Sequence, residues 1–471
     1  MKFNCKYFLL FTLFFILSFD LCEAANIEVI IDERIELTSI AFRLAGAKEY
    51  VTDCAPTYLK EVDDYFSKYK NHPLIKYIKE LRDNEQLNIG YSNVAYSALL
   101  FDIREGHVKP NFNKDSELPK YKYWPKDSFL KYLKLLDEFY VYTKFEWFWN
   151  KHEESRNTSK KEAEEVINNN MLDLHWFEEF FAQSPKQIYM YLALANGQHN
   201  YGGINDTNPE RIELIIGCNC EIDGAPTINR AMMDVIPHEL CHSCGDSVAR
   251  TIIPQIISSF NMIYPYICQQ TKSFGYGDNN PEVAALESLT ELFANVYLSH
   301  IGYKYIGYVI ARDDFRGYLW MADALRFMKN FLENREQYPS IVEFLPQLVA
   351  YYNELPDRFE FLMNKFLACR PYVESTYPAN GSTVSSNLRE IKITLSQPMI
   401  NAFGCGLIDG YEQVKTMEYR LSEDHRTFIL KLDKPLEPGK QYGLLIDAPM
   451  LVSEDNFHRV SNNYELYFNV E

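Results

Sequence analysis

The chain has 471 residues, of which 47% are hydrophobic and 24% charged, a balance typical of globular proteins. A chain of this length is too long to fold around one ordinary hydrophobic core, so two or three domains are expected. The formal net charge of −18 would repel nucleic acids and anionic membranes, which excludes both as expected partners.

The N-terminus is predicted to be a secretory signal peptide. Two lysines flank the start of an uncharged apolar run, Tyr7 to Phe19, and Cys22-Glu23-Ala24 resembles a small-x-small cleavage site. Residues 1–24 would then be removed from a secreted, periplasmic or cell-surface protein. A lipid anchor at Cys22 is the alternative, although the residues before it fit a lipoprotein signal poorly. No later stretch reaches ~18 apolar residues, so no membrane span is expected.

The next 344 or so residues are predicted to form a mainly helical domain with a small sheet, over residues 25–368. Strands are expected over residues 26–32 and at Arg211 to Gly217. Helical periodicity covers residues 56–84 (with a break at Asn71-His72-Pro73), 128–149, 151–169, 172–182, 227–247, 258–298 (as two helices) and 318–367.

Beyond Cys369 the apolar period changes from 3.6 to 2. Residues 369–471 are therefore predicted to form an all-β sandwich, so that the whole chain is of the α+β class. The alternating residues are Ile391, Ile393 and Leu395; Phe428, Leu430 and Leu432; Tyr442, Leu444 and Ile446; and Tyr464, Leu466, Phe468 and Val470.

The strongest chemical signal is His238-Glu239-Leu240-Cys241-His242. Histidines at i and i+4 lie on one helical face, so both imidazoles can reach one cation. Glu239 would stay close enough to take a proton from a zinc-bound water that attacks a carbonyl. Pro237 either kinks a continuing helix or marks the first turn of a new one.

A catalytic zinc ion needs a third protein ligand, which another helix should supply. In PEVAALESLTELFA, Glu287 and Glu291 lie one turn apart. One glutamate can bind zinc while the other hydrogen-bonds a ligand histidine. The residues alone leave the choice open.

The combination of HExxH with a later glutamate and an acid four residues beyond it resembles the glutamate zincins, or gluzincins. The resemblance implies that Glu287 is the third zinc ligand and Glu291 the supporting acid. The metzincin pattern would require a histidine where Val248 stands.

Residues 25–368 also resemble an uncharacterised family of secreted bacterial proteins with HExxH and a later E-S-L motif. The matching segments are DYFSKYKNHP, NGQHNYGG, HELCHS, Glu287-Ser288-Leu289 and RGYLW. The tail resembles a bacterial Ig-like module, on the segments PANGS, IKITLSQPM and PLEPGKQY.

The sequence therefore predicts a secreted zinc metallopeptidase with one Zn²⁺ bound by His238, His242 and Glu287, with Glu239 as the catalytic base and a peptide or protein as substrate. Two alternatives remain: a cell-surface binding protein with a vestigial zinc site, and a zinc hydrolase of a non-peptide amide. The substrate, the oligomeric state and the role of the tail are left open. So is the donor that stabilises an oxyanion, for which the candidates are Tyr201, His199, Tyr297, His300 and Arg312.

Overall fold

The computed structural model describes residues 27–471 except 53, 85–86, 88, 114–123, 171, 184–185, 206–207, 274–279, 448–449, 455–457 and 461–462. The predicted signal peptide, residues 1–24, lies outside the described residues. The chain divides into two compact units. The first comprises the residues up to Val248 together with Pro339–Ile341, and the second comprises Ala249–Tyr338 and Val342–Glu471.

The first unit is built around a mixed four-stranded sheet of order β1-β4-β6-β5. Strands β1 (Ile27–Ile30), β4 (Gln187–Ala193) and β6 (Asn208–Gly217) run parallel, and β5 (Asn200–Asn205) pairs antiparallel with β6 at the edge. The two central strands are rich in buried Ile, Leu and Met, as expected for parallel strands covered on both faces.

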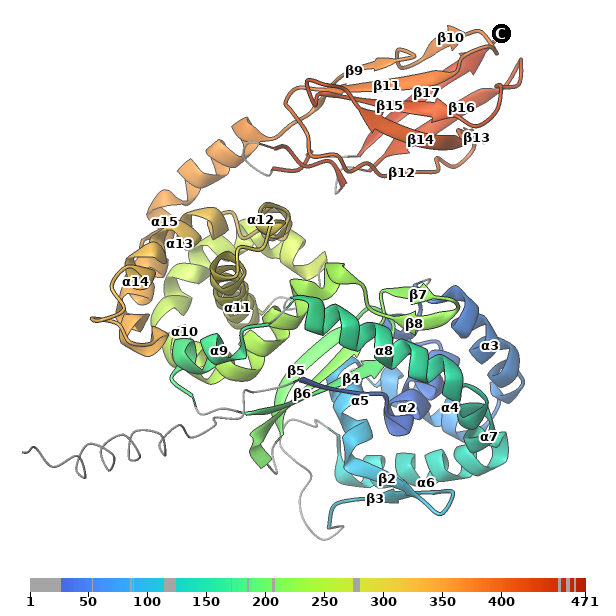
Figure 1. Ribbon diagram of the computed structural model, residues 1–471, viewed down its shortest axis with the longest axis vertical. Helices are drawn as coiled ribbons and strands as arrows, with labels where there is room; N and C mark the ends of the chain where they lie inside the picture. Colours follow the sequence, from blue (N-terminus) through green and yellow to red (C-terminus); the bar gives the residue numbers. More distant parts are fainter. Residues whose placement is uncertain are drawn as a thin grey trace, which may run out of the picture. The chain divides into compact units, whose positions relative to one another are not determined.

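Helices and two small hairpins complete the first unit (Figure 1). Its core is strongly aromatic, because helices α3, α6 and α7 bring together the rings of Phe66, Phe139, Phe145 and Phe148. The helices are α2 (Glu33–Leu44), α3 (Pro56–Phe66), α4 (Pro73–Asp83), α5 (Tyr91–Ser97), α6 (Lys126–Thr143), α7 (Phe145–Lys151), α8 (Glu153–Asn170) and α9 (Leu174–Phe181), and the hairpins are β2 (Phe101–Arg104) with β3 (His107–Pro110) and β7 (Cys220–Ile222) with β8 (Ala225–Thr227).

The longest helix, α10 (Val235–Ser273), carries the histidine motif near its start. Pro237 is its third residue, so this proline lies in the first turn, where its missing N–H costs no helical hydrogen bond. The expectation of a helix from Thr227 is wrong. Thr227 pairs with Cys220 in the β7–β8 hairpin, and the side chain of Asn229 caps a short 3-10 helix before α10 begins.

The second unit begins within α10, at Ala249. The helices that follow it in the chain include the long α15, whose C-terminal end leads into the β region. Pro281 occupies the first turn of α11, and the Asn280 side chain accepts hydrogen bonds from the backbone N–H groups of Glu282 and Val283. This capping fixes the start of the helix that carries both candidate glutamates. The helices are α11 (Pro281–His300), α12 (Ile306–Phe315), α13 (Met321–Phe327), α14 (Lys329–Leu332) and α15 (Ile341–Cys369).

The C-terminal strands form two sheets (Figure 1), of order β14-β15-β11-β9 and β10-β17-β16-β12, with β13 paired to β16. Alternate residues from both sheets, such as Ile393, Phe428, Leu444 and Phe468, share one buried core, which is the packing of a β-sandwich. The strands are β9 (Val373–Tyr377), β10 (Ser382–Val384), β11 (Glu390–Leu395), β12 (Cys405–Gly406), β13 (Glu412–Gln413), β14 (Thr416–Leu421), β15 (Thr427–Leu432), β16 (Gln441–Ile446) and β17 (Tyr464–Val470).

The expected combination of helices, small sheets and a C-terminal β region is confirmed. Within the described ranges, no helix is long and apolar enough to cross a membrane.

Candidate metal centre

The first turns of α10 hold His238 and His242 on one face of the helix, as their four-residue spacing predicts. Their Nε2 atoms lie 3.1 Å apart, and the two rings meet nearly edge to face. His238 is buried, whereas the His242 side chain is 17% exposed. Two imidazole nitrogens are thus directed at one point.

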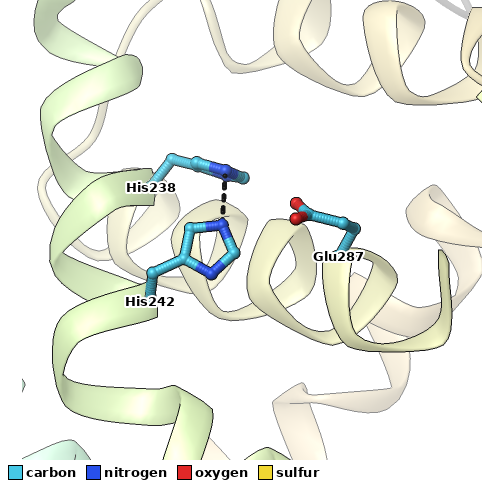
Figure 2. A group of neighbouring side chains, drawn as sticks. All are labelled: His238, His242 and Glu287. Carbon is cyan, nitrogen blue, oxygen red and sulfur yellow. Dashed lines mark hydrogen bonds between the residues drawn. The ribbon is translucent and has the colours of Figure 1, made fainter. Parts of the chain in front are cut away.

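Glu287 of α11 joins these histidines, and Figure 2 shows its carboxylate directed toward the two rings. One ligand atom from each of His238, His242 and Glu287 lies within 4.8 Å of the others. The three residues that the sequence named as metal ligands therefore form one group. Their binding of a metal ion stays a prediction.

The geometry of this group fits a zinc ion. Two nitrogens bound to tetrahedral zinc at about 2.0–2.1 Å lie about 3.3 Å apart, close to the 3.1 Å between the Nε2 atoms. Two imidazoles and a carboxylate are also a ligand set that catalytic zinc sites use, with a fourth position left for water or substrate.

Asp246 orients one of the histidines. Its Oδ1 atom lies 3.0 Å from Nδ1 of His242, so the carboxylate can accept the Nδ1 proton and leave Nε2 as the atom that binds a cation. The sequence analysis missed this residue. Its position four residues after His242, on the same helical face, is the signal that could have identified it.

Glu239 is buried close to the sheet edge, because β5 passes directly over α10. A side chain at Gly202 would place its Cβ 2.2 Å from the backbone oxygen of Glu239, which only glycine avoids. Ser243 packs beside them and donates a hydrogen bond to that same oxygen. The close approach holds the candidate base against the edge strand.

Two tyrosines lie within electrostatic reach of Glu239. Burial, with the charges of Glu239 and Glu213, raises the pKa of Tyr96 well above its usual value. Burial, with the charges of Glu49 and Glu239, does the same for Tyr201. Both hydroxyls thus stay protonated at neutral pH and can donate hydrogen bonds. The sequence analysis named Tyr201 but missed Tyr96, which no motif marks.

The other candidate donors lie in different surroundings. The His199 ring packs against Tyr91, and burial lowers its pKa. Tyr297 is completely buried in α11, and His300 is exposed at the end of that helix.

Glu291, one turn beyond Glu287, lies in a cluster of buried charges. Its carboxylate pairs with Arg316, and Arg312 lies 3.9 Å away. Asp313 accepts a hydrogen bond of 2.7 Å from Asn295. Burial and the charge of Glu291 raise the pKa of Asp313. The structure thus surrounds this second glutamate with arginines.

The C-terminal residues 369–470 match the family model described as a bacterial Ig-like domain. The β region is a bacterial Ig-like domain. The family match agrees with the two-sheet packing of these strands. Such modules occur in proteins with many different functions. Residues 124–351 match a domain of unknown function, DUF4932. That match includes the histidine motif and both candidate glutamates.

No curated protein matches the chain significantly. Among solved structures, the S-layer protein rSbsC is 16% identical with a TM-score of 0.18, over 48% of this chain and 31% of that one. Domains 1–6 of surface layer protein SbsC give 15% identity and a TM-score of 0.18, over 54% of this chain and 35% of that one. The chain thus spans about a third of these proteins. Such TM-scores carry no conclusion about fold or function.

Proposed function

We propose that this protein is a secreted zinc metallopeptidase. The observation that carries the proposal is the group of His238, His242 and Glu287, whose ligand atoms lie within 4.8 Å of one another, next in sequence to the buried Glu239. A ligand set with an adjacent carboxylate base combines the two parts that metal-assisted hydrolysis requires.

In the proposed reaction, Glu239 takes a proton from the attacking water and later returns it to the leaving amine. A bound zinc ion would supply Lewis acidity, which makes water more acidic and polarises the substrate carbonyl. Asp246 keeps the His242 ring in the orientation that directs Nε2 toward the cation.

The mixed sheet supplies a place for an extended peptide. Strand β5 is the edge of the sheet, so one side of it has no strand partner among the described residues. A substrate could pair with this edge through main-chain hydrogen bonds. Gly202 brings the same strand against Glu239, so a peptide bound there would lie near the base.

Tyr201, on that edge strand, is the donor we favour for the oxyanion that forms when water attacks the carbonyl. Its hydroxyl stays protonated and lies within electrostatic reach of Glu239. Tyr96 meets the same condition, but its hydroxyl donates to the backbone oxygen of Glu213, which favours a structural role.

The test is a profile of peptides released from a complex protein digest by the zinc-loaded protein, measured by mass spectrometry. Glu239→Gln should lower turnover by about 10²–10⁴-fold, the usual contribution of a general base, while zinc content is unchanged. The exposed Glu80→Gln is the matched control and should cleave like the parent. Equal cleavage by parent and Glu239→Gln, or no cleavage of any peptide by the zinc-loaded parent, would refute the proposal.

A further inference from the structure

A cavity formed by residues far from the histidine motif in sequence lies within the second unit. Its volume is about 460 Å³, within the ~300–1,000 Å³ range of small-molecule sites. Helices α11 to α15 supply most of its wall, and His458 of the Ig-like domain completes it.

The inner surface of this cavity is largely apolar. Leu319, Leu325, Leu362 and Phe366 line its wall, and Leu362 is buried. Covering such a surface with an apolar ligand removes it from water, which favours binding.

The rim of the cavity is cationic, although the chain as a whole carries a net charge of −18. Arg326, Lys329 and Lys365 line it. Arg326 is already paired with Asp323. For the two lysines, no ion pair occurs within the part of the chain that the structure describes. Two positive charges therefore remain available to a ligand.

The acidic residues of the wall, Asp323 and Asp314, have partners other than the two lysines. Asp323 also pairs with Arg358 at 3.1 Å, and buried Asp314 lies 3.3 Å from Nδ1 of His458. The His458 ring in turn packs edge-on against Phe366. The Ig-like domain thus contributes His458 to one wall of the cavity, where it is the hydrogen-bond partner of buried Asp314.

We propose that this cavity binds an organic anion with an apolar body, of the medium-chain carboxylate class. The carboxylate would lie between Lys329 and Lys365, and the chain would cover the leucines and Phe366 inside. This site is independent of the metal centre and of the proposed peptidase activity.

The test is isothermal titration of the full chain with decanoate, compared with uncharged decanol and with acetate. Decanoate should bind, and decanol and acetate should each bind at least about tenfold more weakly. Decanol lacks the negative charge, and acetate lacks the apolar chain. Equal binding of decanol, or no binding of decanoate, would overturn the proposal.

Two variants locate the site. The double variant Lys329→Glu/Lys365→Glu should weaken decanoate binding by about tenfold or more, whereas Lys415→Glu/Lys434→Glu, with two exposed lysines of the Ig-like domain, should not. Ala322→Trp, which fills the cavity from α13, should block binding without reversing any charge. Melting curves confirm that each variant is folded. Decanoate affinity unchanged in both the lysine double variant and Ala322→Trp would place the ligand elsewhere and refute the proposal.

Discussion

Two carboxylates four residues apart on α11 have very different surroundings. Glu287 lies with two imidazoles, with ligand atoms within 4.8 Å of one another. Glu291, 1% exposed at its side chain, is paired with Arg316 and lies near Arg312. The helix repeat makes the two positions equivalent in sequence, and only the neighbouring helices distinguish them.

This difference separates a candidate ligand from a structural charge. A carboxylate that arginines neutralise is held for its ion pair, and removing it leaves buried positive charge uncompensated. A carboxylate that meets two histidine nitrogens is arranged as a site for a cation. Substitution of each glutamate should therefore have a different effect on the protein.

The variants Glu287→Gln and Glu291→Gln should therefore lose different properties, the first zinc affinity and the second stability. Glu287→Gln should keep its stability but lose zinc affinity by more than the about 10–100-fold typical of an outer-shell partner. Glu291→Gln should unfold more easily by about 3 kcal/mol, because Arg316 and Arg312 lose a buried negative charge beside them. Zinc titration and denaturant unfolding of both proteins measure this. The reverse pattern would exchange the two roles.

Glu36 extends the comparison to a buried carboxylate in α2 that has no arginine partner within hydrogen-bonding distance among the described residues. It accepts hydrogen bonds from the Tyr58 hydroxyl and the Ala195 N–H group. Burial nevertheless raises its pKa from 4.5 to about 7. The folded state therefore binds its proton more tightly than the unfolded state.

Stability from this group is fully present below pH 4.5 and is lost as the pH rises toward 7. Glu36→Gln, which cannot ionise, should remove that loss. The variant should gain up to about 3 kcal/mol relative to the parent between pH 4.5 and 8, measured by urea unfolding at each pH. A difference that does not change with pH would show that Glu36 is not the titrating group.

The smallest effect is expected at Asp246, which contacts a candidate ligand without belonging to the group of three. Asp246→Ala should weaken zinc binding by about 10–100-fold, and Asp246→Asn should recover part of this, because its amide oxygen can still accept the Nδ1 proton of His242. Competition with a zinc chelator provides the affinities. If both variants bind zinc like the parent, Asp246 does not orient His242.

Much of this arrangement could be predicted where it depends on local periodicity. The alternation from Ile391 to Val470 predicted the strands of the Ig-like domain, and the i, i+4 spacing predicted that His238 and His242 share a face. The start of α10 could not be predicted as well. The apolar residues after Thr227 fit a helical period, but strand pairing with Cys220 takes precedence.

Contacts between distant segments were beyond the reach of the sequence. Tyr96 lies near Glu239 only because the fold brings α5 close to β5 and α10, a proximity visible at Gly203, where a Cβ would lie 2.9 Å from the Tyr96 hydroxyl. The arginines around Glu291 likewise come from α12 and the residue that follows it. Spacing within one helix contains no information about such partners.

The most direct test of the central claim is the zinc content and zinc affinity of the purified protein, measured by elemental analysis and calorimetry beside His238→Ala and His242→Ala. We predict one zinc ion per chain in the parent and none retained by either variant, because each imidazole supplies a ligand that the others cannot replace. A parent that binds no zinc, or variants that bind it as tightly as the parent, would contradict the assignment of His238, His242 and Glu287 as a metal centre.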